Sequence, residues 1–363
     1  MNNLISIKLL IFSPLLISIF FLLPIFSGHT VLIRRFAKLF AGLHFLYSLL
    51  FYVFANTTTA NSSYLALLNT SNLNSETPLN FLSELTFFGS SWINSLGIKL
   101  TFGLDGISIF FVILTSFLVL MACIASKSVI KSKHSLYYAL IFILETAILG
   151  VFASCDMFEF FMFWELELIP MYFLISLWGD GRAKKSAMKF LLYTFISSLF
   201  MLVGLLMLYN FNFIATGIFS ADIHTLTLNI DTTPVYLQIL ASLFMLFGFA
   251  VKIPIVPFHT WLPNAHVDAP APISMLLAGI LLKMGAYGII RFNLQLLPDA
   301  FLYIAPYLVV LAFINIIFAA ITAYYQSDIK AIVAYSSIST MGIVLLGICS
   351  LNTIGLTGAI FLM

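Results

Sequence analysis

The chain of 363 residues is far more apolar than a water-soluble protein. Hydrophobic residues make up 62% of it and charged residues 8%, with a net charge of +2, whereas about 25% of the residues in a typical soluble domain are charged. This composition excludes a soluble enzyme, gives no reason to expect nucleic acid as a partner, and predicts an all-α polytopic membrane protein.

Ten segments are long and apolar enough to cross a membrane as complete helices, at about 20 residues for each crossing. The first is too long for the apolar core of a signal peptide and lacks an A-x-A-like cleavage site. An eleventh apolar run begins near Thr353 and stops at Met363 without a cap or a polar tail, so we expect a chain that is truncated there. The ten helices are predicted near residues 4–26, 36–55, 104–125, 135–154, 157–178, 188–209, 236–257, 271–292, 302–325 and 329–350.

Two other features carry little functional signal. The stretch 56–75 is rich in Asn, Ser and Thr and is predicted to be a loop. Cys123, Cys155 and Cys349 lie in apolar surroundings without C-x-x-C spacing, so we expect neither a disulfide framework nor a metal or iron–sulfur site. We therefore expect no cofactor in this chain.

Basic residues collect in loops that would share one side of the membrane. Because Lys and Arg accumulate on the cytoplasmic side, this side is predicted to be the inner one and the N-terminus to lie outside. The opposite side would carry Lys8, Lys99 and Arg291. The basic residues that follow the first, third, fifth and ninth predicted helices are Arg34, Arg35, Lys38, Lys127, Lys131, Lys133, Arg182, Lys184, Lys185, Lys189 and Lys330.

Four charged side chains lie well inside predicted spanning helices: Glu145, Glu165, Lys252 and Lys283. A charge at the centre of such a helix costs about 2.5 to 3.5 kcal/mol on insertion scales, so it usually faces a protein interior, a partner charge or water. Glu145 and Glu165 lie about ten and about nine residues from the turn at 155–156, which places both carboxyls about 15 Å from that turn and near the middle of the membrane. Two acids and two bases at this depth suggest a charge relay.

The acids allow more than one interpretation. A buried carboxyl near a second carboxyl and a lysine can be poised to exchange protons near neutral pH. Alternatively, Glu145 and Glu165 could be a pair of structural hydrogen-bonding acids. For Glu159 and Glu167, the sequence leaves open both a place closer to the interface and an ordinary helix contact.

Lys252 lies in a segment that cannot form an uninterrupted helix, A-V-K-I-P-I-V-P-F-H-T-W-L-P. Pro254 and Pro257 lack amide hydrogens and clash with the preceding turn, so a break is predicted here, with the carbonyls at 249–253 left without regular helical partners. A broken helix at membrane depth persists only where protein or water satisfies the freed carbonyls. Lys252 is therefore predicted to border a hydrated gap.

Three further titratable residues follow the break. His259 and His266 are interpreted as proton-path residues, because histidine titrates closest to neutral pH. Satisfied structural histidines are the main alternative, and no Cys, Asp or Glu cluster completes a metal site around them. Lys283 lies in A-G-I-L-L-K-M-G-A-Y-G, whose glycines leave room for a neighbouring helix or water. A buried lysine that changes charge could pass a proton on, whereas a fixed salt bridge is the structural alternative.

Sequence motifs of other chemistries are missing. The chain has no Walker loop, no G-x-G-x-x-G, no H-E-x-x-H and no nucleophile elbow. Secondary transporters also combine interrupted helices with charges at the membrane midplane, so a substrate transporter is a competing class. A channel fits less well, because a relay of titratable groups resists the passage of hydrated ions.

Four segments together resemble the antiporter-like membrane subunits of respiratory complex I: F-W-E-L-E-L-I-P-M-Y-F-L-I-S-L-W-G, A-V-K-I-P-I-V-P-F-H-T-W-L-P-N-A-H, L-A-G-I-L-L-K-M-G-A-Y-G-I-I-R and Q-S-D-I-K-A-I-V-A-Y-S-S-I-S-T-M-G. The similarity covers about residues 95–363 and is strongest to the subunit type designated M in bacteria, 4 in mitochondria and D in the cyanobacterial and plastid complex. It implies inverted five-helix repeats with a broken seventh helix. The N-terminal helices and a polar external loop would occupy 1–103, a first antiporter-like half 104–292, and the incomplete second half 293–363.

The same resemblance assigns residues to a proton relay: Glu145, Glu165, Lys252, Lys283, His259 and His266. Within this relay, Glu165 and Lys252 are predicted to form a coupled pair. The sequence departs from the family at Asn264, where Asp is usual, at Asp268, and at Thr340, where S-x-S-H-M-G supplies a histidine. Thr340 cannot titrate near neutral pH, which weakens the expected link to the second repeat unless it holds a bridging water.

The resemblance implies a proton-translocating membrane subunit of an NADH or ferredoxin:quinone oxidoreductase. Redox centres and the sites for NADH and quinone would lie in other subunits, and the expected partners are the other membrane subunits of complex I and membrane lipid. The bacterial plasma membrane is the preferred location, with thylakoid and inner mitochondrial membranes as alternatives. The alternative function is a subunit of the related multi-subunit cation/proton antiporters.

Overall fold

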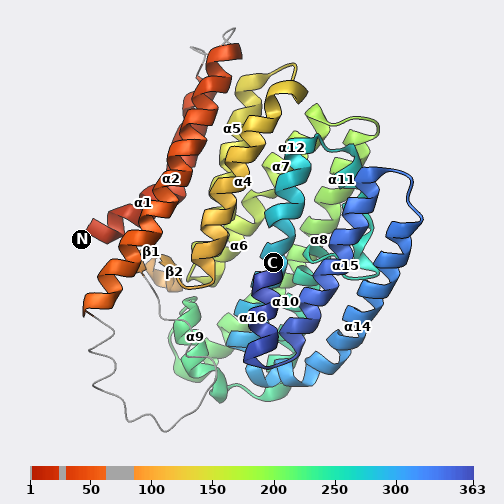
Figure 1. The fold of residues 1–363 in the computed structure, drawn as a ribbon. Helices are drawn as coiled ribbons and strands as arrows, with labels where there is room; N and C mark the ends of the chain where they lie inside the picture. The colour runs from red at the N-terminus through yellow and green to blue at the C-terminus, as the bar shows by residue number, and fades with distance from the viewer. Residues whose placement is uncertain (1, 24–29, 63–85) are drawn as a thin grey trace.

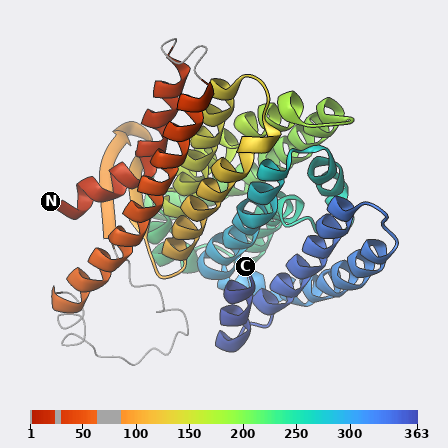
Figure 2. The ribbon, with the colours of Figure 1, turned by 45° about the horizontal axis from the view of Figure 1, so that its top comes forward.

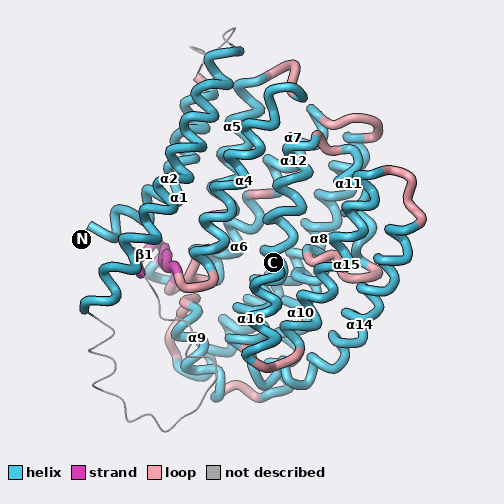
Figure 3. The backbone as a smooth tube through the Cα atoms, viewed as in Figure 1, coloured by secondary structure: helices cyan, strands magenta, loops and turns pink. Residues whose placement is uncertain are grey.

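The computed structural model describes residues 2–23, 30–62 and 86–363. They form a bundle of helices (Figures 1 and 3), and nine of the described helices are long and apolar enough to cross a membrane. The described apolar helices at Ile7–Leu22 and Thr353–Leu362 are shorter. Each segment predicted to be a helix is therefore helical over most of its length, which confirms an all-α polytopic membrane protein.

The elements follow one another with short connections. The first are α1 (Asn2–Leu22), α2 (Thr30–Ser62), β1 (Thr86–Ile93), η2 (Asn94–Leu96), β2 (Ile98–Leu104), α4 (Ser108–Val129), α5 (His134–Ala153), α6 (Met157–Leu166), α7 (Leu168–Trp178), α8 (Ala183–Thr216), α9 (Ile223–Asn229) and η3 (Ile230–Thr232). They are followed by α10 (Val235–Lys252), η4 (Phe258–Thr260), α11 (Trp261–Asp268), α12 (Ala271–Leu276), η5 (Leu277–Leu281), α13 (Leu282–Gly288), η6 (Ile289–Leu296), α14 (Pro298–Tyr324), α15 (Ile329–Cys349) and α16 (Thr353–Leu362).

The bundle has two flanks and two ends. Helices α1 and α2 pack against α5 and α4 on one flank, and α14 and α15 pack together on the opposite flank (Figures 1 and 2). The connections α4–α5, α7–α8 and α14–α15 lie at the top in Figure 1 and form what we call the basic end, since they carry the lysines and arginines used to predict orientation. The opposite end carries α9 and the β1–β2 hairpin.

The hairpin ahead of α4 is absent from the sequence prediction, which begins a helix at residue 104. Strands β1 and β2 pair antiparallel from Thr86 opposite Leu104 to Ile93 opposite Ile98, and α4 begins at Ser108. The turn contains Gly97 with a φ of 62°, a left-handed conformation that glycine adopts without steric cost. The hairpin was hidden in the sequence because an apolar run of this length fits a short strand and a helix start equally well.

Two acids of α6 fasten this hairpin. The carboxylate of Asp156 caps α6 by accepting from the amides of Phe158 (2.9 Å) and Glu159 (3.3 Å), and it also accepts from the amide of Lys99 (3.2 Å). Glu159 accepts from the amide of Thr101 at 3.1 Å. Of the two readings open for Glu159, the structure shows a buried structural contact.

The predicted loop at 56–75 is wrong at its start. Helix α2 continues through Asn56 to Ser62, and residues 63–75 lie outside the described part of the chain. Each residue added to an existing helix gains one hydrogen bond without a new nucleation cost, so a helix nucleated in an apolar segment can extend into a polar one.

The predicted helix at 157–178 is interrupted at Glu167, between α6 and α7. The cause lies three residues further along, at Pro170. Proline has no amide hydrogen for the carbonyl four residues earlier, that of Leu166, and its ring clashes with that carbonyl. The chain therefore changes direction at Glu167.

The predicted break after Lys252 is confirmed, because α10 ends at that residue. The carbonyl of Ala250 accepts from the amide of Ile255 at 2.9 Å, and that of Val251 accepts from the indole nitrogen of Trp261 at 2.9 Å. The prediction was wrong for Phe249, whose carbonyl keeps a regular partner, the amide of Ile253, at 2.8 Å. Protein groups thus satisfy these carbonyls, and the hydrated gap stays a prediction.

Small residues let α8 and α10 approach closely. A methyl group placed on Gly204 of α8 would lie 2.8 Å from the carbonyl oxygen of Ala241, and one on Gly248 of α10 would lie 3.1 Å from that of Ser197. These contacts are with backbone, which cannot rotate away. Glycines at helix interfaces in membranes permit this close packing, which positions the end of α10 and with it Lys252.

We expect Gly204→Ala to destabilise the protein, because its new methyl group would force α8 and α10 apart. Overpacking of this kind costs about 1–3 kcal/mol. The matched control is Gly42→Ala in α2, where the new methyl group would meet a methyl group of Leu120 at an ordinary 3.9 Å. Thermal unfolding in detergent should show a lower midpoint for Gly204→Ala and none of this loss for Gly42→Ala. Equal midpoints for the two variants would contradict the close packing.

Candidate functional site

Lys252 lies at the centre of the site, at the end of α10, and only 1% of it is exposed. Its ammonium forms an ion pair with the carboxylate of Glu167, which is fully buried at the interruption between α6 and α7. The ammonium also lies 4.3 Å from the centroid of the Trp164 ring, whose face attracts cations. Two helix breaks therefore bring opposite charges together in the interior of the bundle.

The acid in direct contact with Lys252 is thus Glu167, and not Glu165 as the sequence predicted. Glu165 is half-buried, interacts with the hydroxyl of Ser198 on α8, and attracts Lys252 electrostatically. Residues two apart on a helix point to different sides, so Glu165 and Glu167 cannot both face α10. Of the two readings open for Glu167, neither an interface position nor an ordinary contact describes this buried ion pair.

Glu145 has a partner that the sequence does not indicate. Its Oε1 lies 2.8 Å from Nδ1 of His44 on α2, and both residues are buried. The other ring nitrogen of His44 lies 2.9 Å from the carbonyl oxygen of Leu10 on α1. The midplane acid of α5 is therefore tied to the α1–α2 flank rather than to Glu165.

Lys283 lies in α13, between the two wider-wound π-helical segments η5 and η6. Its ammonium donates a hydrogen bond to the carbonyl of Ala278 in the preceding turn. Among the described residues, Lys283 belongs to none of the ion pairs. A fixed salt bridge, the structural alternative raised by the sequence, is thus not what the described part of the chain shows.

Gly285 brings α13 against the break in the seventh helix. A methyl group placed on it would lie 3.0 Å from the amide nitrogen of Ile253 and 3.1 Å from Cβ of Lys252. Lys283 therefore belongs to the element that packs directly on the Lys252 break. The two lysines predicted to act in series come from adjoining elements.

The two histidines lead from the break toward α15. His266 is buried on α11 and interacts electrostatically with Lys283 and Lys330, and its carbonyl accepts from the hydroxyl of Ser274 at 2.9 Å. The ring of His259 packs edge-on against Phe318 of α14, with 5.4 Å between ring centroids. No group of three or more potential metal ligands occurs among the described residues.

The three residues that depart from the family pattern lie on the α11–α15 side. The hydroxyl of Thr340 on α15 is exposed and donates to the carbonyl of Ser337 at 2.9 Å. Asn264 is exposed on α11. Asp268 accepts a hydrogen bond from Ser186 at the start of α8. In the described structure, then, Thr340 is satisfied within its own helix.

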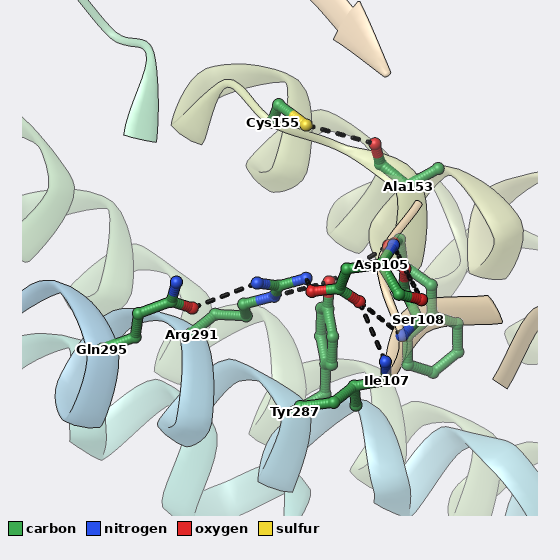
Figure 4. Close-up of polar contacts among 9 residues, drawn as sticks. Asp105, Ile107, Ser108, Ala153, Cys155, Tyr287, Arg291 and Gln295 are labelled. Carbon is green, nitrogen blue, oxygen red and sulfur yellow. Dashed lines mark hydrogen bonds and ion pairs between the residues drawn. The ribbon is translucent and has the colours of Figure 1, made fainter. Parts of the chain in front are cut away.

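A second polar cluster, at the opposite end, is centred on Arg291 of η6 (Figure 4). The guanidinium reaches between Gln295 and Asp105, forming an ion pair with Asp105 and donating to Oε1 of Gln295 at 3.0 Å. It also donates to the hydroxyl of Tyr287 at 2.9 Å, and that hydroxyl donates to the carbonyl of Phe152 at 3.0 Å. An arginine does not lose its proton near neutral pH, so this cluster fixes η6 to the start of α4 and is not a relay.

Asp105 connects this cluster to α4. Its Oδ1 accepts from the amides of Ile107 (3.1 Å) and Ser108 (2.7 Å) at the start of that helix. A cavity of about 160 Å³ beside it is also lined by Asp222 and His224. In the sequence, Arg291 counted only as a base on the outer side, although Lys283, Tyr287, Arg291 and Gln295, each four residues apart, mark a polar stripe that could have indicated the cluster.

Comparisons with known proteins match this arrangement. Residues 154–363 match the transmembrane family described as NADH:quinone oxidoreductase/Mrp antiporter. The chain is 47% identical over 272 residues to NAD(P)H-quinone oxidoreductase chain 4 2 of Thermosynechococcus vestitus, covering 75% of this chain and 50% of that one. It is 46% identical over 277 residues to NAD(P)H-quinone oxidoreductase chain 4 of Acaryochloris marina, with the same coverage. The chain spans about half the length of the curated relatives it matches.

Solved structures share the fold. A chain of respiratory complex I from Thermus thermophilus with bound NADH superposes with a TM-score of 0.79 at 25% identity, covering 98% of this chain and 67% of that one. A chain of the Mrp complex from Dietzia superposes with a TM-score of 0.78 at 19% identity, covering 100% of this chain and 62% of that one, which is a likeness of fold alone. With a match over more than half of its length, the chain belongs to the NADH:quinone oxidoreductase/Mrp antiporter family of integral membrane proteins.

Proposed function

We propose that the chain is a proton-translocating membrane subunit of an NAD(P)H- or ferredoxin-dependent quinone oxidoreductase. The names of the relatives support membership of such a complex. The observation that carries the proposal is the buried Lys252–Glu167 ion pair at two helix breaks, packed against the element that bears Lys283. Charges at this depth are costly and typically mark ion or proton pathways.

The ion pair supplies the switch of the proposed mechanism. A proton that reaches the Glu167 carboxylate neutralises it and removes the attraction that stabilises the Lys252 ammonium in a dry environment. Glu165, which also attracts Lys252, then becomes the remaining counter-charge. Loss or displacement of the Lys252 proton changes the field at Lys283, and Lys283 in turn acts on His266.

Two members of the predicted relay lie at its ends. Glu145, with His44, lies at the α1–α2 flank, and His259 lies beside α14 at the other. In this proposal protons move through Glu145, Glu165, Lys252, Lys283, His266 and His259, with Glu167 added as the direct partner of Lys252. Electron transfer takes place in other subunits, which bind NADH and quinone. The bacterial plasma membrane is the preferred location, with the thylakoid as the alternative that the cyanobacterial relatives favour.

A subunit of a multi-subunit cation/proton antiporter is the second candidate. The shared family description and the fold of the Mrp complex favour it. Membranes that contain the complete complex distinguish the two functions. Proton pumping that requires NADH or ferredoxin oxidation supports the first, whereas cation-driven proton exchange without electron transfer supports the second.

We expect Glu167→Gln to lower coupled proton translocation strongly, on the order of 10²-fold as for loss of an acid–base group, because Lys252 loses its direct counter-charge. Glu165→Gln should have a smaller effect, since Glu165 acts on Lys252 from a greater distance. Quinone reduction and pH-gradient formation should be measured together in membranes with assembled complex. The control is Asp299→Asn, an exposed acid at the start of α14. Retained pumping in Glu167→Gln with loss in Glu165→Gln would favour Glu165 as the functional partner of Lys252.

Lys283→Arg tests whether Lys283 changes charge. Arginine keeps the positive charge but does not release its proton near neutral pH, given a pKa above about 12. The variant should therefore assemble and lose most coupled proton transfer, whereas a purely electrostatic anchor would tolerate the exchange. Lys184→Arg, an exposed lysine at the basic end, controls for the substitution itself. Full pumping in Lys283→Arg would show that Lys283 is structural.

A further inference from the structure

A second buried acid–base pair lies away from the Lys252 site. His44 is 4% exposed and Glu145 is 0% exposed, and their Nδ1 and Oε1 atoms are 2.8 Å apart, a distance typical of a charge-assisted hydrogen bond. The two residues come from α2 and α5, which are neighbours on the α1–α2 flank in Figure 2. The pair lies outside residues 154–363, the part matched by the family.

The backbone of α1 fixes the tautomer of His44. Its Nε2 lies 2.9 Å from the carbonyl oxygen of Leu10. A carbonyl oxygen only accepts hydrogen bonds, so Nε2 must carry a hydrogen. Nδ1 therefore faces Glu145 either as an acceptor from a carboxylic acid or as a donor to a carboxylate. One proton is shared between Nδ1 of His44 and Oε1 of Glu145.

The shared proton makes the pair tolerant of burial. With Nε2 hydrogenated and one further proton in the bond, the pair has zero net charge, whichever atom holds that proton. Burying an uncompensated charge would cost several kcal/mol, whereas a compensated, hydrogen-bonded pair avoids most of this cost. The nearby titratable group of α4 is the buried thiol of Cys123, which interacts with Glu145.

We propose that His44 is a further proton-carrying residue of the relay, which exchanges a proton directly with Glu145. The proton leaves Oε1 of the Glu145 carboxylic acid and binds Nδ1 of neutral His44, so that a carboxylate and an imidazolium form; the reverse step restores both neutral groups. This inference rests on the proposed function, and it extends the relay from α5 to α2. The Leu10 carbonyl keeps the ring oriented while the proton moves.

His44→Asn separates proton exchange from structure. The Asn amide can occupy the place of Nδ1 and donate a hydrogen bond to Glu145, but it cannot take up a proton. We expect assembled complex whose proton pumping falls on the order of 10²-fold, and no further loss when Glu145→Gln is added, because the two residues act as one unit. The matched control is His134→Asn, a buried histidine at the start of α5 that contacts Arg34 instead.

Infrared difference spectra provide a readout that a structural role would not change. Between resting and NADH-energised membranes, the wild type should show loss of a protonated carboxyl signal together with gain of an imidazolium signal. The carboxyl signal should be absent in Glu145→Gln, and both should be absent in His44→Asn. Full pumping in His44→Asn with loss in Glu145→Gln would overturn the role of His44 alone. Full pumping in both variants, with loss in Glu167→Gln, would remove the pair from the relay while the proposed function stands. Full pumping in all three would overturn the proposed function.

Discussion

The high cost of an unpaired charge in an apolar interior organises this molecule. Each of the three ion pairs among the described residues joins elements that are far apart in sequence: His44 with Glu145, Glu167 with Lys252, and Asp105 with Arg291. Because a lone charge in such surroundings would cost several kcal/mol, these pairs constrain which helices can be neighbours. The same constraint makes the pairs responsive to protonation, since adding one proton to an acid leaves its partner uncompensated.

Helix breaks decide which charges meet. Pro170 interrupts the fifth predicted segment at Glu167, and Pro254 ends α10 at Lys252. A straight helix would keep its side chains at fixed angles, whereas two interrupted helices can present a carboxylate and an ammonium to each other from their ends. The freed backbone is satisfied by protein, through the Trp261 indole and the Asn315 amide oxygen, which accepts from the amide of Val256 at 3.0 Å.

The pairs differ in the chemistry they allow. A carboxylate with a lysine or a histidine can gain and lose protons within the range of biological pH, whereas the guanidinium of Arg291 retains its proton and holds η6 to α4. Proton movement is thus assigned to the interior of the bundle, and the Arg291 cluster anchors its opposite end. Between them, Tyr287 packs edge-on against Phe152, with 5.0 Å between ring centroids.

The membrane class, the helical segments, the break after Lys252 and the identity of the buried charged residues follow from the amino-acid order alone, because hydropathy, segment length and proline chemistry are local properties. The acid that contacts Lys252 does not, because Glu165 and Glu167 lie on the same segment and only the packing of α6 and α7 on α10 selects between them. Nor does the amino-acid order single out His44, since a histidine in an apolar helix acquires a role only from its neighbour. Pairing across helices depends on distances between residues remote in the chain, and those distances are set by the tertiary structure.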